Sequence, residues 1–320
     1  MASATELAAQ AALYGIVSAV VVETLIRRLP VPAPGDRFRY RLCTLILPVA
    51  LPPLFGALAP LRATEAFADL ALFSTSRWQR LAVAGVGLRD LGLAVLGVLG
   101  AALVLRDIWR DALHWWRDRR ALRPRGTHRG AADPDPVLQA EVEGLARRMG
   151  IATPRLLLLD TDAAILHCRG VRRPTVMVAR GVVDRLAPDQ LRGALAHELA
   201  HVRHRDVERG WLLALLRAVQ WFNPVAQLVA RRAALEVEWR ADAEAAAVTA
   251  QPLALARALL TCVRGRDTVF LGLLGRGRVA ALEQRCRRLL DGVPARQGRA
   301  DAWSLTMVGA GLSVLLFFVV

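Results

Sequence analysis

The sequence predicts an α+β domain, mainly helical with a small sheet, combined with transmembrane α-helices. Three observations predict this fold class: a high hydrophobic content, four long apolar stretches, and one region in which helical and strand patterns alternate. The chain has 320 residues, of which 54% are hydrophobic, and its mean hydropathy is +0.33. These values are high for a soluble protein and indicate a membrane protein.

Four apolar stretches approach or exceed the roughly 20 residues that a helix needs to cross a bilayer. The predicted spans are residues 7–26, 42–61, 81–105 and 302–320. The second span contains three prolines, which predict a kink. In the third span Arg89 and Asp90 are close enough to pair. For this third span, a buried helix of a soluble helical domain is the alternative interpretation.

Arginines set the predicted orientation. All 43 basic residues are arginine, and the formal net charge is +15. Basic residues are retained on the cytoplasmic side of a membrane, and the densest run directly follows the third span. We therefore expect residues 106–301 on the cytoplasmic side of the cell membrane, in a multi-pass protein. The run consists of Arg106, Arg110, Arg117, Arg119, Arg120, Arg123, Arg125 and Arg129.

These arginines and three nearby tryptophans, Trp109, Trp115 and Trp116, resemble an interfacial belt against the lipid bilayer. Because no nucleic-acid-binding motif accompanies the charge, a nucleic-acid partner is not expected. The four cysteines are far apart with no CxxC pair, which is compatible with a reducing compartment. The predicted organisation is three spans in residues 1–105, a basic juxtamembrane segment and linker in 106–136, a cytoplasmic domain in 137–301, and the fourth span in 302–320.

Within residues 137–301, apolar spacing predicts a helix over 137–149 and short buried strands over 155–159 and 175–179. Pro188 and Asp189 then open a helix that continues through Val202. That helix carries the sequence His197-Glu198-Leu199-Ala200-His201.

Two histidines at i and i+4 lie on one face of a helix, where both imidazoles can bind one tetrahedral zinc ion. Glu198 projects beside them, where it can take a proton from water that attacks a peptide carbonyl. The spacing therefore predicts a zinc metallopeptidase with His197 and His201 as metal ligands, Glu198 as the catalytic base, and one zinc ion per chain.

A catalytic zinc ion needs a third protein ligand and an open fourth position. A third histidine ten residues after His197 is excluded, because Val207 stands there. Glu238 and Asp242 lie i and i+4 on a later predicted helix, so Glu238 can bind the metal while Asp242 accepts a hydrogen bond from a ligand imidazole. Glu236 competes as the ligand, but the residue four positions later is Arg240, which cannot accept such a bond.

These segments resemble the gluzincin membrane peptidases, which include the beta-lactam sensor-transducers and the heat-shock and prenyl-protein endopeptidases. The resemblance covers about residues 156–290 and includes His204-Arg205-Asp206, the Trp221-Phe222-Asn223-Pro224 segment and a basic amphipathic helix over 278–290. The arrangement is most similar to that of the sensor-transducer branch, with three spans, a peptidase domain and then a fourth span. The chain stops within the fourth span, before the position of that branch's extracellular ligand-binding domain, so penicillin sensing is not supported.

The resemblance implies a zincin-type fold and zinc-dependent endopeptidase activity. It also implies that residues Thr175, Val176, Met177, Val178 and Ala179 form an edge strand along which a substrate backbone pairs. Asp206 matches the acid that follows the motif in this family. A local ion pair that holds the helix end or Arg203 and a plain surface position are equally open for it. For Trp211–Phe222, a core helix is favoured over a helix against the membrane.

The expected function is hydrolysis of a protein at or near the inner membrane surface. The substrate is either a cytoplasmic repressor, in regulated signalling, or a membrane protein, in quality control. The competing class is a catalytically inactive membrane scaffold or receptor-like protein that retains the zincin fold. Because His197, Glu198, His201, Glu238 and Asp242 are all intact, the enzyme is the favoured interpretation.

Overall fold

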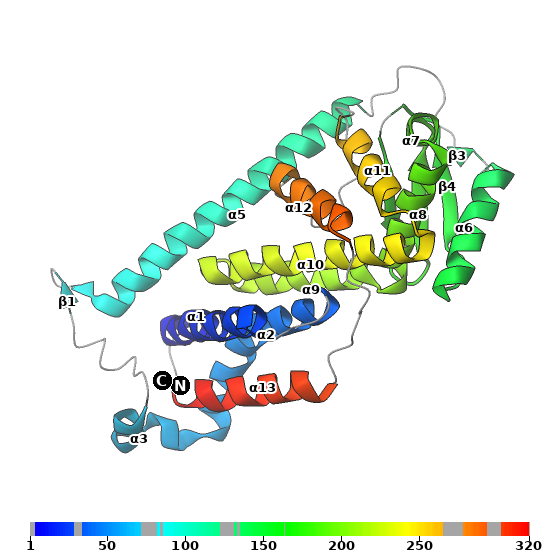
Figure 1. The fold of residues 1–320 in the computed structure, drawn as a ribbon. Coiled ribbons are helices and arrows are strands. Elements are labelled where there is room, and N and C mark those ends of the chain that lie inside the picture. The colour runs from blue at the N-terminus through cyan, green and yellow to red at the C-terminus, as the bar shows by residue number, and fades with distance from the viewer. Residues whose placement is uncertain are drawn as a thin grey trace. The chain divides into compact units, whose positions relative to one another are not determined.

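The computed structural model describes residues 4–28, 34–71, 82–83, 86–121, 131–132, 135–162, 164–264, 278–292 and 302–319 (Figure 1). The chain divides into two compact units. The first, residues 1–108, 213–233 and 296–320, contains the four expected spans, and the second, residues 109–212 and 234–295, contains most of the expected peptidase domain. After these expectations we call them the membrane unit and the peptidase unit. Of the predicted juxtamembrane segment and linker, residues 106–136, positions 122–130 and 133–134 lie outside the described residues.

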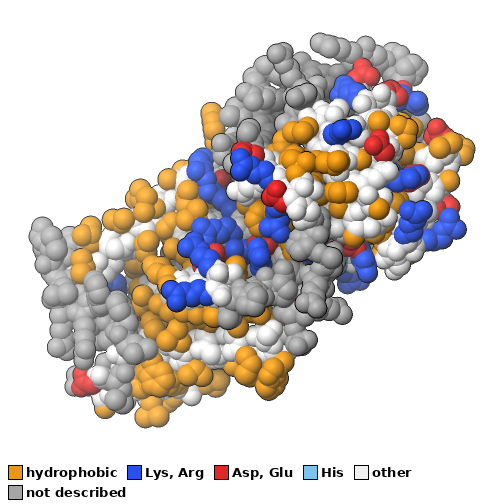
Figure 2. Space-filling model, in the orientation of Figure 1, with side chains coloured by type: hydrophobic (Ala, Val, Ile, Leu, Met, Phe, Trp, Pro, Cys, Tyr) orange, Lys and Arg blue, Asp and Glu red, His pale blue; other side chains and the backbone are white. Residues whose placement is uncertain are grey.

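Three helices of the described residues are long and apolar enough to cross a membrane. They are α1 (Ala4–Arg28), α2 (Pro34–Leu58) and α5 (Leu88–Ala121). The predicted fourth span forms α13 (Ala302–Phe317), an apolar helix of 16 residues. Figure 2 shows a wide area of hydrophobic side chains on the face in view, as expected of helices that contact lipid.

The second and third spans differ from their predicted bounds. Helix α2 begins eight residues before position 42 and keeps three prolines inside it. Helix α5 begins at Leu88 because a short hairpin precedes it, and it continues to Ala121, well past its apolar part, which ends at Asp107. The small elements between α2 and α5 are η1 (Pro60–Ala63), α3 (Glu65–Leu70), β1 (Ala82–Val83) and β2 (Val86–Gly87).

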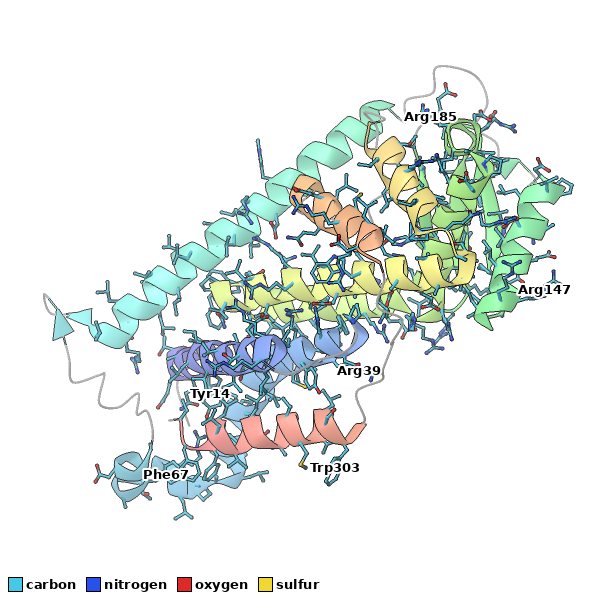
Figure 3. The ribbon with its side chains drawn as sticks, viewed as in Figure 1. Tyr14, Arg39, Phe67, Arg147, Arg185 and Trp303 are labelled. Atoms are coloured by element: carbon cyan, nitrogen blue, oxygen red, sulfur yellow. The ribbon has the colours of Figure 1, made fainter. Side chains whose placement is uncertain are left out.

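Polar side chains join the helices of the membrane unit. Arg62, which is buried, donates to Tyr14 Oη at 2.6 Å and to the Val319 carbonyl at 2.8 Å. Tyr14, which Figure 3 labels on α1, donates to the same carbonyl at 2.9 Å. A charge in an apolar unit is costly unless it is paired and hydrogen-bonded. These bonds therefore hold α1, η1 and the end of the chain together.

The peptidase unit contains a four-stranded sheet, with the order β3-β4-β6-β5. Strand β4 (Arg155–Leu159) is parallel to β6 (Thr175–Ala179), whereas β3 (Ala131–Ala132) and β5 (Leu166–Arg169) are antiparallel to their neighbours. The mainly helical α+β fold class with a small sheet is confirmed.

The prediction that residues 175–179 lie at an edge of the sheet is wrong. Residues 175–179 do form a strand, but β6 pairs with β4 on one side and with β5 on the other. The sequence pattern missed β5, whose four residues Leu-His-Cys-Arg mix apolar and polar types without a clear alternation. Among the described strands, β5 is the one at the edge next to β6.

One face of the sheet packs on α6 (Pro136–Met149) and α8 (Pro188–Arg203). The core between them includes Val142, Leu158, Val176 and Leu195, all buried. Helix α6 ends at Gly150, whose φ of 66° is the left-handed conformation that favours glycine at a helix C-terminus. Short helix α7 (Arg180–Arg185) connects β6 to α8.

The remaining helices are α9 (Asp206–Val219), α10 (Pro224–Thr249), α11 (Pro252–Arg264) and α12 (Arg278–Leu290). Asn223 begins α10, because its side-chain oxygen accepts the N–H groups of Val225 and Ala226. The sequence favoured a core helix for Trp211–Phe222. In the structure, one face of α9 is instead exposed and apolar, at Trp211, Leu215 and Val219.

Candidate metal centre

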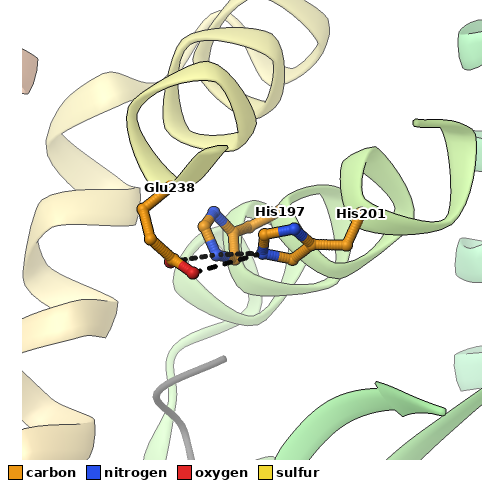
Figure 4. A group of neighbouring side chains, drawn as sticks. All are labelled: His197, His201 and Glu238. Atoms are coloured by element: carbon orange, nitrogen blue, oxygen red, sulfur yellow. Dashed lines mark hydrogen bonds and ion pairs between the residues drawn. The ribbon is translucent and has the colours of Figure 1, made fainter. Parts of the chain in front are cut away.

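Two helices of the peptidase unit supply the predicted site residues. Helix α8 is buried almost continuously from Gly193 to His201, because it crosses the core between the sheet and α11. The two helices are close at Gly193, where an added Cβ atom would be in van der Waals contact with the Leu255 backbone of α11 at 3.4 Å. Helix α10 then brings Glu238 opposite the two histidines of α8 (Figure 4).

The ligand atoms of His197, His201 and Glu238 all lie within 4.8 Å of one another, and the three residues are buried. The two Nε2 atoms are 3.2 Å apart, and Glu238 Oε2 is 3.5 Å from His197 Nε2. Two zinc–nitrogen bonds of about 2.05 Å at a tetrahedral angle place their nitrogens about 3.3 Å apart. The spacing of these atoms therefore fits one shared zinc ion.

Carboxylates contact the opposite nitrogen of each imidazole. His197 Nδ1 lies 3.0 Å from Asp242 Oδ1, and His201 Nδ1 donates to Asp206 Oδ2 at 2.9 Å. A proton held on Nδ1 by a carboxylate leaves the Nε2 lone pair available for a metal. Both imidazoles thus present a lone pair to the same point, which a cation would stabilise.

The surface position considered for Asp206 is wrong, and Arg203 pairs with Glu244 instead. Asp206 is buried at the start of α9, and besides His201 it pairs with Arg240 at 2.5 Å and with Arg209 at 3.0 Å. A sequence signal was present, because Asp206 follows His201 by five residues, within reach just past the end of α8. Glu236, by contrast, does not belong to the group of three, since a residue two positions before Glu238 faces another side of α10.

Glu198 lies beside the histidines and is buried. Its Oε2 atom accepts the backbone N–H of Cys168, on the edge strand β5, at 2.9 Å. Burial raises the pKa of the Glu198 carboxyl, although the imidazoles of His201 and His197 partly oppose the shift. A carboxylate with a raised pKa is suited to accept a proton near neutral pH.

A further residue, Arg285 of α12, reaches the centre, and only 2% of its surface is exposed. Its Nε and Nη2 atoms each donate to Asp242 at 2.7 Å, its Nη1 lies 3.1 Å from Glu238 Oε2, and its Nη2 lies 3.3 Å from His197 Nε2. The sequence analysis predicted α12 as a basic amphipathic helix but gave Arg285 no role in the site. The signal was its spacing, because Arg285 falls between the buried Leu282 and Leu289 on one helical face.

The charges of the buried groups also favour a bound cation. Among the residues that the structure describes at the centre, four buried carboxylates, those of Glu198, Asp206, Glu238 and Asp242, face two buried guanidiniums, those of Arg240 and Arg285. Arg209, nearer to solvent, neutralises Asp206 in part. The centre therefore keeps an excess of negative charge, which is costly to bury unless protons or a metal ion compensate it.

The pKa values of His197 and Glu238, two ligand residues that face each other, reflect this excess of negative charge. Burial lowers the pKa of His197, but its contacts with Asp242 and Glu238 outweigh burial and raise the pKa to about 9. Burial raises the pKa of Glu238, but Arg285 and the imidazoles outweigh it and lower the pKa to about 2. Without metal, these shifts favour a protonated His197 beside an ionised Glu238 at neutral pH, and binding of a divalent ion would release that proton.

Replacing Asp206 by asparagine should weaken zinc binding about 10- to 100-fold, because His201 loses the carboxylate that orients its ring and raises its basicity. Zinc affinity is measured by competition with a chelating indicator, and circular dichroism checks the fold. Asp184→Asn, at an exposed position of α7, is the matched control and should bind zinc as the parent does. Equal affinity in the two variants would show that Asp206 does not act on His201.

Comparison with known proteins identifies the family. The model of the family described as BlaR1 peptidase M56 matches residues 90–287, which is more than half of the chain. The chain belongs to the BlaR1 peptidase M56 family. The matched region of this M56 member contains the whole metal centre, including Arg285.

Curated relatives of the M56 chain are named Protease HtpX homolog. One from Acidiphilium cryptum is 31% identical over 185 residues, which cover 46% of this chain and 63% of that protein. Another from Aquifex aeolicus is 32% identical over 123 residues, covering 36% of this chain and 41% of that protein. The similarity thus spans less than two thirds of either relative's length. A third, from Polynucleobacter necessarius, is 29% identical over 218 residues, or 56% of this chain and 76% of that protein.

Proposed function

We propose that the chain is an integral membrane zinc endopeptidase that cleaves a protein at or near the cytoplasmic face of the membrane. The observation that carries this proposal is the convergence of two imidazole Nε2 atoms and the Glu238 carboxylate within 4.8 Å, beside the buried Glu198. Family membership and the protease names of the relatives support the peptidase class.

His197, His201 and Glu238 would hold the metal. When bound, zinc supplies Lewis acidity, which polarises the scissile carbonyl. Glu198 takes a proton from the attacking water and passes it to the leaving amine. Arg285, whose Nη2 lies 3.3 Å from His197 Nε2, would stabilise the negative charge that develops on the carbonyl oxygen. Asp206 and Asp242 keep the imidazoles oriented throughout.

The substrate would bind as an extended strand along β5. Cys168 N–H points away from β6 and donates to Glu198, so the outer edge of β5 borders the proposed catalytic base. The backbone of an extended peptide that pairs with this edge lies next to Glu198. Such pairing uses backbone hydrogen bonds, so it does not depend on particular side chains of the peptide. This proposal replaces 175–179 by 166–169 as the substrate-pairing strand.

The orientation of the peptidase unit rests on the arginine distribution, which favours the cytoplasmic side. Single cysteines introduced at exposed positions of α6 in a cysteine-free variant should resist a membrane-impermeant thiol reagent in intact cells and react after lysis. Labelling of these positions in intact cells would place the unit outside and contradict the proposed location. Either role, regulated cleavage of a repressor or quality control of membrane proteins, is compatible with an inner location.

Chelation tests the proposed activity. Detergent-purified protein should cleave casein, or itself, and a zinc chelator followed by desalting should remove at least nine tenths of that activity, as expected for metal catalysis. Adding about one equivalent of zinc should restore it, whereas magnesium should not, because the centre offers imidazole nitrogens. Cleavage that persists in the chelated protein would exclude a metallopeptidase. A protein that binds zinc but cleaves neither itself nor casein would favour the inactive scaffold.

A further inference from the structure

The turn that joins α9 to α10 packs against the helices of the membrane unit. A Cβ atom added at Gly100 of α5 would lie 2.6 Å from the carbonyl carbon of Phe222, and one added at Gly15 of α1 would lie 2.6 Å from Asn223 Nδ2. Both distances are shorter than real Cβ contacts. Glycine at these two positions therefore lets the turn lie directly against α1 and α5.

These contacts lie well inside the candidate spans. Gly100 precedes Asp107, where the span of α5 ends, by seven residues. The Leu45 carbonyl, which accepts a hydrogen bond from the turn at 3.0 Å, follows Pro34, the first residue of the α2 span, by 11 residues. At 1.5 Å per residue the turn lies about 10 to 16 Å inside these ends, a third to a half of the hydrocarbon core.

Two ion pairs mark the level at which the hairpin of α9 and α10 enters this apolar zone. Arg217 of α9 and Arg231 of α10 pair with Asp107 at 2.5 and 2.9 Å. Residues 218–230, which connect the two arginines, include no charged residue, and we call them the hairpin tip. The charges thus stay at the end of the α5 span, and the uncharged hairpin tip lies beyond them, alongside its apolar part.

Amide side chains satisfy backbone groups at the turn. Gln227 donates to the carbonyls of Arg217 and Gln220 at 3.0 and 3.1 Å, and the Asn223 side chain accepts two N–H groups at the start of α10. The three amide residues are buried. A chain can turn within hydrocarbon only where its backbone polar groups are paired inside the protein. These bonds therefore permit a turn at this depth.

The outer side of the hairpin tip is apolar, since Val219, Trp221 and Leu228 each expose about half of their surface. We infer that residues 213–233 form a re-entrant hairpin in the bilayer and that these exposed side chains contact lipid acyl chains. Acyl chains are favoured as the partner because the hairpin tip lies alongside the apolar part of α5. The inference rests on the proposed membrane location of α5, but not on zinc or catalysis.

The accessibility of nitroxide labels tests the inference. Single cysteines replace Val219 or Leu228 in a cysteine-free variant of the full chain, which is labelled and reconstituted into liposomes. Val98→Cys, exposed on the α5 span, is the lipid reference, and Val137→Cys, exposed on α6, is the water reference. Oxygen, which dissolves in lipid, should collide with the labels at 219, 228 and 98 more often than a water-soluble nickel complex does. The order should reverse at 137.

Labels at 219 and 228 that the nickel complex reaches as readily as the label at 137 would place the hairpin tip in water and overturn the inference. Labels that neither reagent reaches would overturn it as well, because protein and not lipid would then cover this face. A water-exposed label at 98 would contradict the proposed membrane location of α5 and the inference together. The reference label therefore distinguishes failure of the hairpin alone from failure of the proposed location.

Two glycines of α5 test the position of the turn. Gly100→Ala should lower the thermal unfolding temperature of the detergent-purified protein by several degrees, because the added methyl group would overlap the backbone of Phe222. At Gly97, the matched control, an added Cβ atom would meet no atom of the described residues within 4 Å. Since alanine otherwise favours a helix, Gly97→Ala should unfold no lower than the parent. Equal unfolding temperatures in the two variants would overturn the inference.

Discussion

Replacing Glu198 by glutamine should lower peptide-bond hydrolysis by about 10²- to 10⁴-fold, the usual contribution of a general base. Glutamine keeps the shape of the side chain and can still contact the Cys168 N–H, but it cannot accept a proton from water. Metal binding should be unchanged, because Glu198 does not belong to the group of His197, His201 and Glu238. Initial rates of casein cleavage and the zinc content of the same preparation are the measurements.

The matched control is Glu143→Gln, at an exposed position of α6. It makes the same chemical change outside the centre, so its rate and zinc content should equal those of the parent. Full activity in Glu198→Gln would mean that another group accepts the proton. The proposed mechanism would then be wrong even if zinc is present.

Replacing Arg285 by methionine should destabilise the metal-free protein by about 3–5 kcal/mol, as expected when one partner of a buried ion pair is removed. Asp242 would lose two hydrogen bonds of 2.7 Å, and Glu238 would lose its contact at 3.1 Å. Bound zinc supplies positive charge at the same point. The loss should therefore be smaller with zinc than with a chelator, as measured by thermal unfolding of the detergent-purified protein.

Arg287→Met is the control on the same helix. Its guanidinium pairs with Glu283 at the surface, where both side chains are largely exposed. Such pairs contribute about 0–1 kcal/mol, so Arg287→Met should unfold close to the parent temperature. An Arg285→Met protein whose unfolding temperature equals that of Arg287→Met, with and without zinc, would show that Arg285 is not needed to neutralise the centre.

Helical spacing explains why much of the centre could be predicted from the sequence. His197 and His201 share a face because they are four residues apart, and the same spacing places Glu238 beside Asp242. These relations are local, so they hold wherever the two helices pack. The strands over 155–159 and 175–179 were found for a similar reason, since each is a short continuous apolar run between polar residues.

Relations between distant segments could not be predicted in the same way. The order of strands depends on which edges meet after folding, so the pattern of Thr175–Ala179 did not reveal that β5 covers its outer side. Asp206 and Arg285 reach the histidines from α9 and α12. The family resemblance drew attention to Asp206, but no spacing within one helix connected either residue to the histidines. Their burial follows from packing, which brings opposite charges together where water is excluded.

The zinc content of the purified chain tests the central claim most directly. Elemental analysis is made on the parent and on His201→Ala, after both are incubated with excess zinc and desalted. We expect about one zinc per chain in the parent and less than one tenth in the variant, because two remaining ligands do not hold a structural or catalytic zinc. A parent chain without zinc, or a variant that keeps it, would contradict the metal centre formed by His197, His201 and Glu238.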